Sequence, residues 1–129
     1  MTNIDVTPRV TAPTWADAPL EYVQWHLKNH PEMYLGFRQH ADAYRLVDPT
    51  RRVSADMICH VLRWHSGMHA SDDQYSVNNV LTPLYARLYV RQRPEANMPT
   101  RSSLLDAMSD QEWDALLDLV PEVNANAEH

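Results

Sequence analysis

Apolar side chains recur every three or four residues along most of the chain, which is the spacing of one face of an α-helix. These stripes predict helices that begin near Asp17, Pro31, Ser54, Thr82 and Ser109. Pro31 fits the first turn of the second helix, because the N–H that a proline lacks has no helical partner there. The pattern therefore predicts a compact all-α domain of four to five helices.

Residues that cap helices support three of these starts. Ser54 is a good N-cap, and Ser109 followed by Glu112 has the form of a capping box. In the fourth helix Pro83 cannot donate an interior hydrogen bond, so Thr82 is the expected N-cap and Pro83 the first helical residue.

The second helix carries a polar face opposite its apolar stripe. Arg38, Asp42 and Arg45 lie at helical spacing on this face. Ion pairs between such neighbours stabilise a helix by only about 0.2–0.5 kcal/mol each. We therefore expect a solvated surface here, and contacts of these arginines with an anion are the less favoured interpretation.

The chain divides into four parts by pattern and composition. Residues 1–16 lack a helical or strand period and are expected to form a flexible arm. Residues 17–99 should form the helical core, with at most a short β segment near Tyr75. Residues 100–121 are expected to pack on that core as an acidic helical segment, and residues 122–129 to form a flexible tail.

Composition agrees with a helical, single-core protein. The chain has 129 residues, 44% of them hydrophobic, with two glycines and nine prolines. The single cysteine cannot form an internal disulfide, and the opening residues lack the pattern of a signal peptide. A cytoplasmic location without membrane association is therefore expected, in the host cell if the protein belongs to a phage.

Charge is distributed unevenly along the sequence, whose formal net charge is −6. Residues 36–101 carry an excess of arginines, whereas residues 102–129 carry acids and no Lys or Arg. A locally basic surface can bind phosphates even in an acidic protein. The sequence therefore predicts DNA binding by a basic surface that involves Arg51, Arg52, Arg63, Asn78, Asn79, Tyr85, Arg87 and Arg91.

In this interpretation the third and fourth helices form a helix-turn-helix-like pair. Arginine and asparagine side chains would contact phosphates or base edges, and Tyr85 or Tyr89 would stack or position them. Roughly fifteen residues separate the two helices, against about 3–4 in the standard motif.

Binding to a host or phage protein is the alternative function. The acidic segment or the tyrosine face would then form the interface, with Tyr89, Asp110, Glu112, Asp114 and Asp118 as candidate contacts. A homo-oligomer is also compatible with the sequence.

Enzymatic and metal chemistry have little support in the sequence. His26 and His30 are four residues apart, as are His65 and His69, but His30 lies against a proline stop and Gly67 interrupts the second pair. The chain contains no nucleophile elbow and no Gly-rich phosphate loop. A non-enzymatic protein without cofactor or metal is expected.

Several short blocks resemble a family of small, mostly uncharacterised proteins of phages and prophage regions. They read NHPEMY at 29–34, VSADMICHVLRW at 53–64, YSVNN at 75–79 and YARL at 85–88. The resemblance spans residues 20–95, and the sequence departs from the family pattern at His65, Val80 and Pro83. It implies a phage or prophage origin and brings no established activity.

Overall fold

The computed structural model describes residues 18–66 and 81–122. Within these ranges the chain forms α1 (Pro19–Asn29), α2 (Pro31–Leu46), α3 (Ala55–Ser66), α4 (Leu81–Gln92), the 3-10 helix η3 (Leu104–Ala107) and α5 (Asp110–Leu117). The described ranges contain no strand, and their only β-type pairing is an isolated parallel bridge between Arg52 and Asn97. The all-α prediction is confirmed, whereas the β segment expected near Tyr75 lies outside the described residues.

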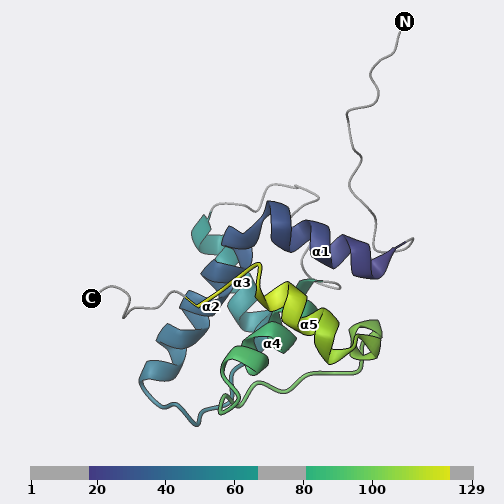
Figure 1. Ribbon diagram of the computed structural model, residues 1–129. Coiled ribbons are helices and arrows are strands. Elements are labelled where there is room, and N and C mark those ends of the chain that lie inside the picture. Colours follow the sequence, from purple (N-terminus) through teal and green to yellow (C-terminus); the bar gives the residue numbers. More distant parts are fainter. Residues whose placement is uncertain (1–17, 67–80, 123–129) are drawn as a thin grey trace, which may run out of the picture.

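Helix α2 lies at the centre of the arrangement and contacts α1, α3 and α4. After α4 the chain runs along the lower edge of the molecule in Figure 1 to η3, and α5 returns beside α4. Among the helices of the described ranges, none has both the length and the apolar character that crossing a membrane requires.

The helix starts follow the local signals in the sequence except at α4 and at α1, which begins at Pro19 with Ala18 as N-cap in place of the expected start at Asp17. Pro19 and Pro31 occupy the first turns of α1 and α2, and the Ser54 hydroxyl accepts a hydrogen bond from the Met57 N–H at 3.2 Å. Helix α4 already includes Leu81 and Thr82 where the described residues resume, so Thr82 is a helical residue and not the expected N-cap.

The predicted capping box at the start of α5 is confirmed. The Ser109 hydroxyl accepts from the Glu112 N–H at 3.1 Å, and the Glu112 carboxylate accepts from the Ser109 N–H at 2.8 Å. A second box, formed by Ser103 and Asp106, opens η3. Both short helices of the C-terminal segment are therefore fixed at their first turn.

Aromatic rings from α2 and α4 form the middle of the core. Phe37 lies 5.3 Å from Tyr85 and 6.1 Å from Tyr89 between ring centroids, and all three side chains are fully buried. Tyr34 meets Tyr85 edge-on at 5.5 Å. Such tilted and edge-on pairs stabilise a core by about 0.5–1.5 kcal/mol each beyond the area they bury.

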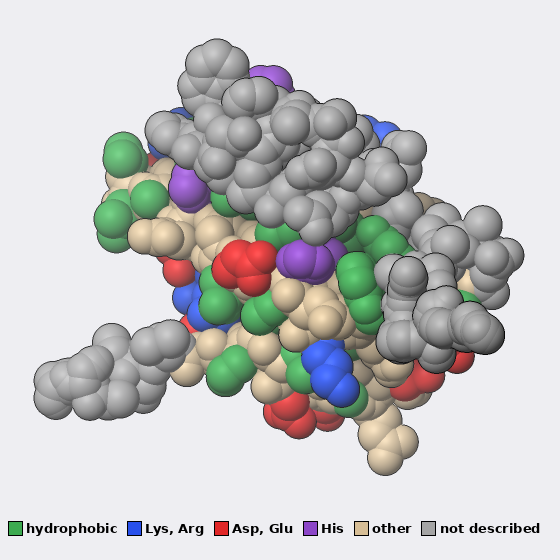
Figure 2. All heavy atoms as spheres, turned by 90° about the horizontal axis from the view of Figure 1, so that it is seen from above, with side chains coloured by type: hydrophobic (Ala, Val, Ile, Leu, Met, Phe, Trp, Pro, Cys, Tyr) green, Lys and Arg blue, Asp and Glu red, His purple; other side chains and the backbone are tan. Residues whose placement is uncertain are grey.

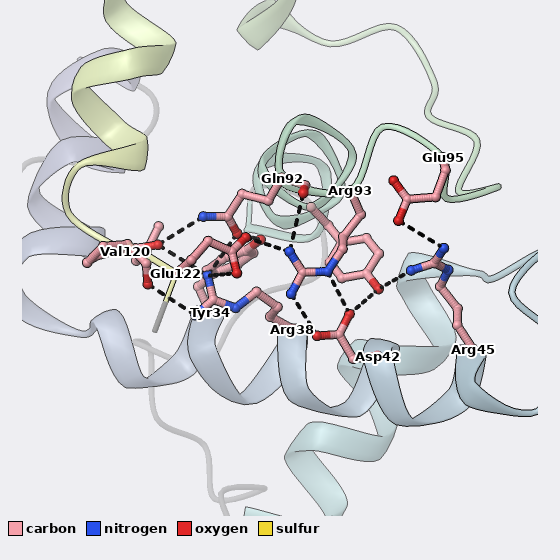
Figure 3. Close-up of polar contacts among 11 residues, drawn as sticks. Tyr34, Arg38, Asp42, Arg45, Gln92, Arg93, Glu95, Val120 and Glu122 are labelled. Carbon is pink, nitrogen blue, oxygen red and sulfur yellow. Dashed lines mark hydrogen bonds and ion pairs between the residues drawn. The ribbon is translucent and has the colours of Figure 1, made fainter. Parts of the chain in front are cut away.

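The polar face of α2 is covered, which corrects the expectation of a solvated surface. Arg38 and Arg45 are each only 7% exposed. Gln92 and residues 120–122 contact Arg38, and Tyr89, Pro49 and Glu95 contact Arg45. Figure 3 shows these side chains pointing toward α4 rather than into solvent. We call this contact the α2–α4 polar seam; besides Arg38 and Arg45 it contains Tyr34, Asp42, Tyr89, Gln92 and Arg93.

Asp42 is the main acceptor of the seam. It accepts a bidentate pair of bonds from Arg93, at 3.1 Å from Nε and 2.9 Å from Nη2, and a 2.5 Å bond from the Tyr89 hydroxyl. Burial raises the pKa of Asp42, but the bonds from Arg93 and Tyr89 outweigh it and hold this pKa below its ordinary 3.8. Burial and the Asp42 carboxylate together raise the pKa of Tyr89 to about 12.

The other half of the seam holds the end of the C-terminal segment. Arg38 donates to the backbone oxygens of Val120 and Pro121, each at 3.2 Å, and to the Gln92 side chain at 2.9 Å. Gln92 in turn donates to Val120 at 3.0 Å, and the Glu122 carboxylate accepts from Arg93 at 2.5 Å. Glu122, which the sequence assigned to the flexible tail, is thus bound to the core.

Replacing Asp42 by Asn should destabilise the protein by about 1–3 kcal/mol, because the charged acceptor shared by Tyr89 and Arg93 is lost. Urea unfolding measures this change. Asp114→Asn, which alters an exposed acid on α5, is the control and should change the unfolding free energy by less than about 0.5 kcal/mol. Equal effects of the two substitutions would contradict the importance of the seam.

The buried His26 should make stability depend on pH. Its Nε2 shares a 2.7 Å hydrogen bond with the Tyr85 hydroxyl, and burial, followed by the charge of His30, lowers its pKa to about 4 from an ordinary 6.5. Because the unfolded chain binds the proton more tightly, the unfolding free energy should fall as pH drops from about 6.5 to about 4, by roughly 2–3 kcal/mol.

Urea unfolding at about pH 7 and about pH 4.5 tests this dependence. His26→Gln should flatten it, whereas the exposed His60→Gln should leave it unchanged. An unaltered pH slope in His26→Gln would show that another group causes the effect.

Candidate anion-binding cleft

A cleft of about 350 Å³ lies where three segments meet. Its lining comes from the start of α3 and the residues before it, from the first half of α4, and from the loop after α4. The lining residues are Arg52, Ser54, Ala55, Asp56, Thr82, Pro83, Ala86, Arg87, Pro99, Thr100, Arg101 and Ser102. We call it the arginine cleft, because three of these residues are arginines.

Pairing between two loops brings Arg52 and Arg101 to the same cleft. The Val53 N–H donates to the Asn97 oxygen at 2.9 Å, within the bridge that joins Arg52 and Asn97. The next residue in each loop, Val53 after Arg52 and Met98 after Asn97, is buried and anchors that loop in the core. Arg52 and Arg101 themselves are exposed, so their guanidinium groups can reach a ligand from solvent.

Arg87 contributes a buried wall of the cleft. Its Nε donates to the Asp106 carboxylate at 2.8 Å and its Nη1 to the Pro83 oxygen at 3.0 Å. Its Nη2 donates to the backbone oxygen of Arg101, so one side chain ties α4 to residues 101–106. Bonds from Arg87 and from the Ser103 N–H lower the pKa of Asp106.

The first turn of α3 adds a further positive feature. Ser54, Ala55 and Asp56 line the cleft, and the backbone N–H groups of a helix start carry partial positive charge. Asp56 is the one acid in the lining and reduces the positive potential. With Asp106 bonded to Arg87, three guanidinium groups face two carboxylates, and the positive charge that remains on Arg52 and Arg101 favours anions.

The chemistry of the lining suits the recognition of phosphate or carboxylate. Guanidinium groups form strong, often bidentate hydrogen bonds with such groups, and the hydroxyls of Ser54, Thr82, Thr100 and Ser102 add neutral donors. Among the described residues, none that lines the cleft has an aromatic ring on which a base would stack. Among the residues that the structure describes, no group of His, Cys, Asp and Glu is arranged to hold a metal ion.

Two residues predicted to bind nucleic acid, Arg52 and Arg87, meet in this cleft. Arg51 instead lies over the ring of Tyr44, at 4.0 Å from its centroid. Arg91 lies 4.9 Å from the centre of a ring of Trp113 and pairs with Asp110 at 3.6 Å. The sequence did not single out Arg101 for this site, because the loop pairing that places it there has no local signature.

The prediction that Tyr85 and Tyr89 are surface contacts is wrong. Both side chains are fully buried in the aromatic core, so neither ring can stack on a base or form part of a partner interface. Their spacing on α4 follows the apolar stripe, and their hydroxyls reach His26 and Asp42. The remaining predicted contacts, Asn78, Asn79 and the side chain of Arg63, lie outside the described residues.

The predicted acidic contacts differ in their surroundings. Asp110 pairs with Arg91, and Glu112 closes the capping box of α5. Asp114 and Asp118 are exposed, one helical turn apart. The C-terminal segment thus directs Asp106 and Asp110 toward two arginines of its own chain and leaves other acids in solvent.

Charged side chains are dispersed over the face drawn in Figure 2. On the uncovered part of this face the blue groups are few and separated from one another, and the coloured, described residues form no continuous basic stripe there. The arginine cleft is a more local feature.

No family model, no curated protein and no solved structure matches this chain.

Replacing Arg87 by Gln should destabilise the protein by about 2–3 kcal/mol, since the variant loses the bonds of a buried guanidinium to two backbone oxygens. Arg91→Gln is the matched control one turn later. The Arg91 side chain is 37% exposed against 9% for Arg87, so its loss should cost less than about 1 kcal/mol. Urea unfolding measures the unfolding free energy of both variants. Equal decreases would contradict a greater structural role for Arg87.

Proposed function

We propose that this protein is a non-enzymatic DNA-binding protein that holds backbone phosphates in the arginine cleft. The observation that carries the proposal is the convergence of Arg52, Arg87 and Arg101 on one cleft at the start of α3. Arginine is well suited to phosphate because its planar group donates two parallel hydrogen bonds. The resemblance to small phage proteins supports an accessory role.

Such binding depends little on base sequence. The lining offers cations and hydroxyls, without the aromatic rings or Asn and Gln side chains that read or stack on bases. Helix α4 would not read base edges, because Arg91 lies over Trp113 and Tyr85 is buried in the core. Affinity would come from phosphate contacts and would decrease steeply with salt.

Removing the two exposed arginines of the cleft should weaken DNA binding. We expect the double variant Arg52→Ser, Arg101→Ser to lose at least about tenfold in affinity at low salt, because two phosphate contacts disappear. The slope of log affinity against log salt should fall by about 1.4 for single-stranded or about 1.8 for double-stranded DNA. Fluorescence anisotropy with labelled oligonucleotides of both kinds measures affinity and slope.

Lys28→Ser is the control for a general loss of positive charge. Lys28 is exposed on α1, which does not contribute to the cleft, so the affinity should change by less than about twofold. Failure of the protein to bind either DNA at low salt, or equal losses in the two variants, would refute the proposal.

Binding to a basic protein partner is the second candidate function. It is favoured by the exposure of Asp114 and Asp118, one turn apart on the outside of the C-terminal segment. If this surface is the functional one, charge reversal at both positions should abolish capture of the partner, and Arg52→Ser, Arg101→Ser should not.

A further inference from the structure

Arg87, in the wall of the arginine cleft, is already bonded to a carboxylate of the chain itself, that of Asp106. Asp106 accepts from Arg87 Nε at 2.8 Å through one oxygen and from the Ser103 N–H at 3.0 Å through the other. The second bond belongs to the capping box of η3, so the carboxylate is fixed in place. The Asp106 side chain is nevertheless 55% exposed and can be reached from solvent.

This ion pair reduces the attraction of the cleft for anions. A phosphate between Arg52 and Arg101 would approach a guanidinium whose charge is balanced by a bonded carboxylate. Carboxylate and phosphate are interchangeable partners for arginine, because both accept its parallel N–H bonds. The two anions therefore repel each other and compete for Arg87.

Two acids of the C-terminal segment pair with two arginines of α4, but only the pair of Asp106 involves the cleft. Asp106 and Asp110 are four residues apart and pair with Arg87 and Arg91, which are also four apart along α4. Of these two arginines only Arg87 lines the cleft. Neither acid is itself a lining residue, so Asp110 is a natural comparison: it has the same charge but pairs with an arginine outside the cleft.

We propose that Asp106 is an internal anion that competes with bound phosphate for Arg87 and thereby sets the affinity of the arginine cleft. This inference rests on the proposed DNA binding and names the residue that limits it. The negative charge of the C-terminal segment then acts on binding chiefly through one carboxylate.

Asp106→Asn tests the proposal directly. The amide retains an oxygen for the Ser103 N–H but removes the negative charge, so binding of a labelled single-stranded oligodeoxynucleotide should become about three- to tenfold tighter. Asp110→Asn should change the affinity by less than about twofold, since its charge is screened and lies outside the cleft. Anisotropy titrations of the full chain at one low salt concentration compare the three proteins.

A second variant separates competition from a structural role. Asp106→Ser also removes the charge and retains a hydroxyl near the cap, and urea unfolding reports the stability of both variants. Tighter binding despite equal or lower stability supports competition. Unchanged or weaker binding in both folded variants would overturn it and would show that Asp106 serves to position Arg87.

The outcomes also separate this inference from the proposed function. Wild-type binding that depends on Arg52 and Arg101 but not on Asp106 refutes the inference alone. Absence of wild-type binding at low salt refutes the proposed function and, with it, this inference.

Discussion

The contact of Asp42 with Tyr89 and Arg93 is the constraint on which the arrangement of the helices depends. Charged groups that are partly withdrawn from water, such as Asp42 at 37% and Arg93 at 22% side-chain exposure, need partners of good geometry. Asp42 satisfies this requirement for one tyrosine and one arginine at once, so α4 has a single favourable register against α2. That register also places Arg87, six residues or about 9 Å of helical rise before Arg93, at the loops that form the cleft.

Arginine is the residue that joins the C-terminal segment to the helices. Arg38 binds the backbone oxygens of Val120 and Pro121, and Arg87 binds that of Arg101 together with the Asp106 carboxylate. A planar group with five donors can bridge several acceptors from one position, which a lysine ammonium does less well. The sequence is consistent with this use, because Lys28 is its only lysine among eleven basic residues.

The sequence predicted the features that depend on neighbouring residues. The opening of α2 by Pro31 and the capping box from Ser109 to Glu112 follow from backbone chemistry within one turn. The expected N-cap of α4, Thr82, is itself helical, because a proline at position 83 is compatible with more than one helix start. The burial of Arg38 and the convergence of Arg52 with Arg101 depend on segments far apart in sequence, which helical periodicity does not describe.

The bonds of Arg87 indicate how one side chain can serve both folding and binding. Its Nη1 and Nη2 atoms hold the backbone of Pro83 and Arg101, while its Nε holds the Asp106 carboxylate. A phosphate that displaced only the carboxylate would leave the two backbone bonds intact. The loop after α4 would then stay in place, because Val53 also holds Asn97 from the other side. Exchange of one anion for another is thus compatible with an unchanged fold.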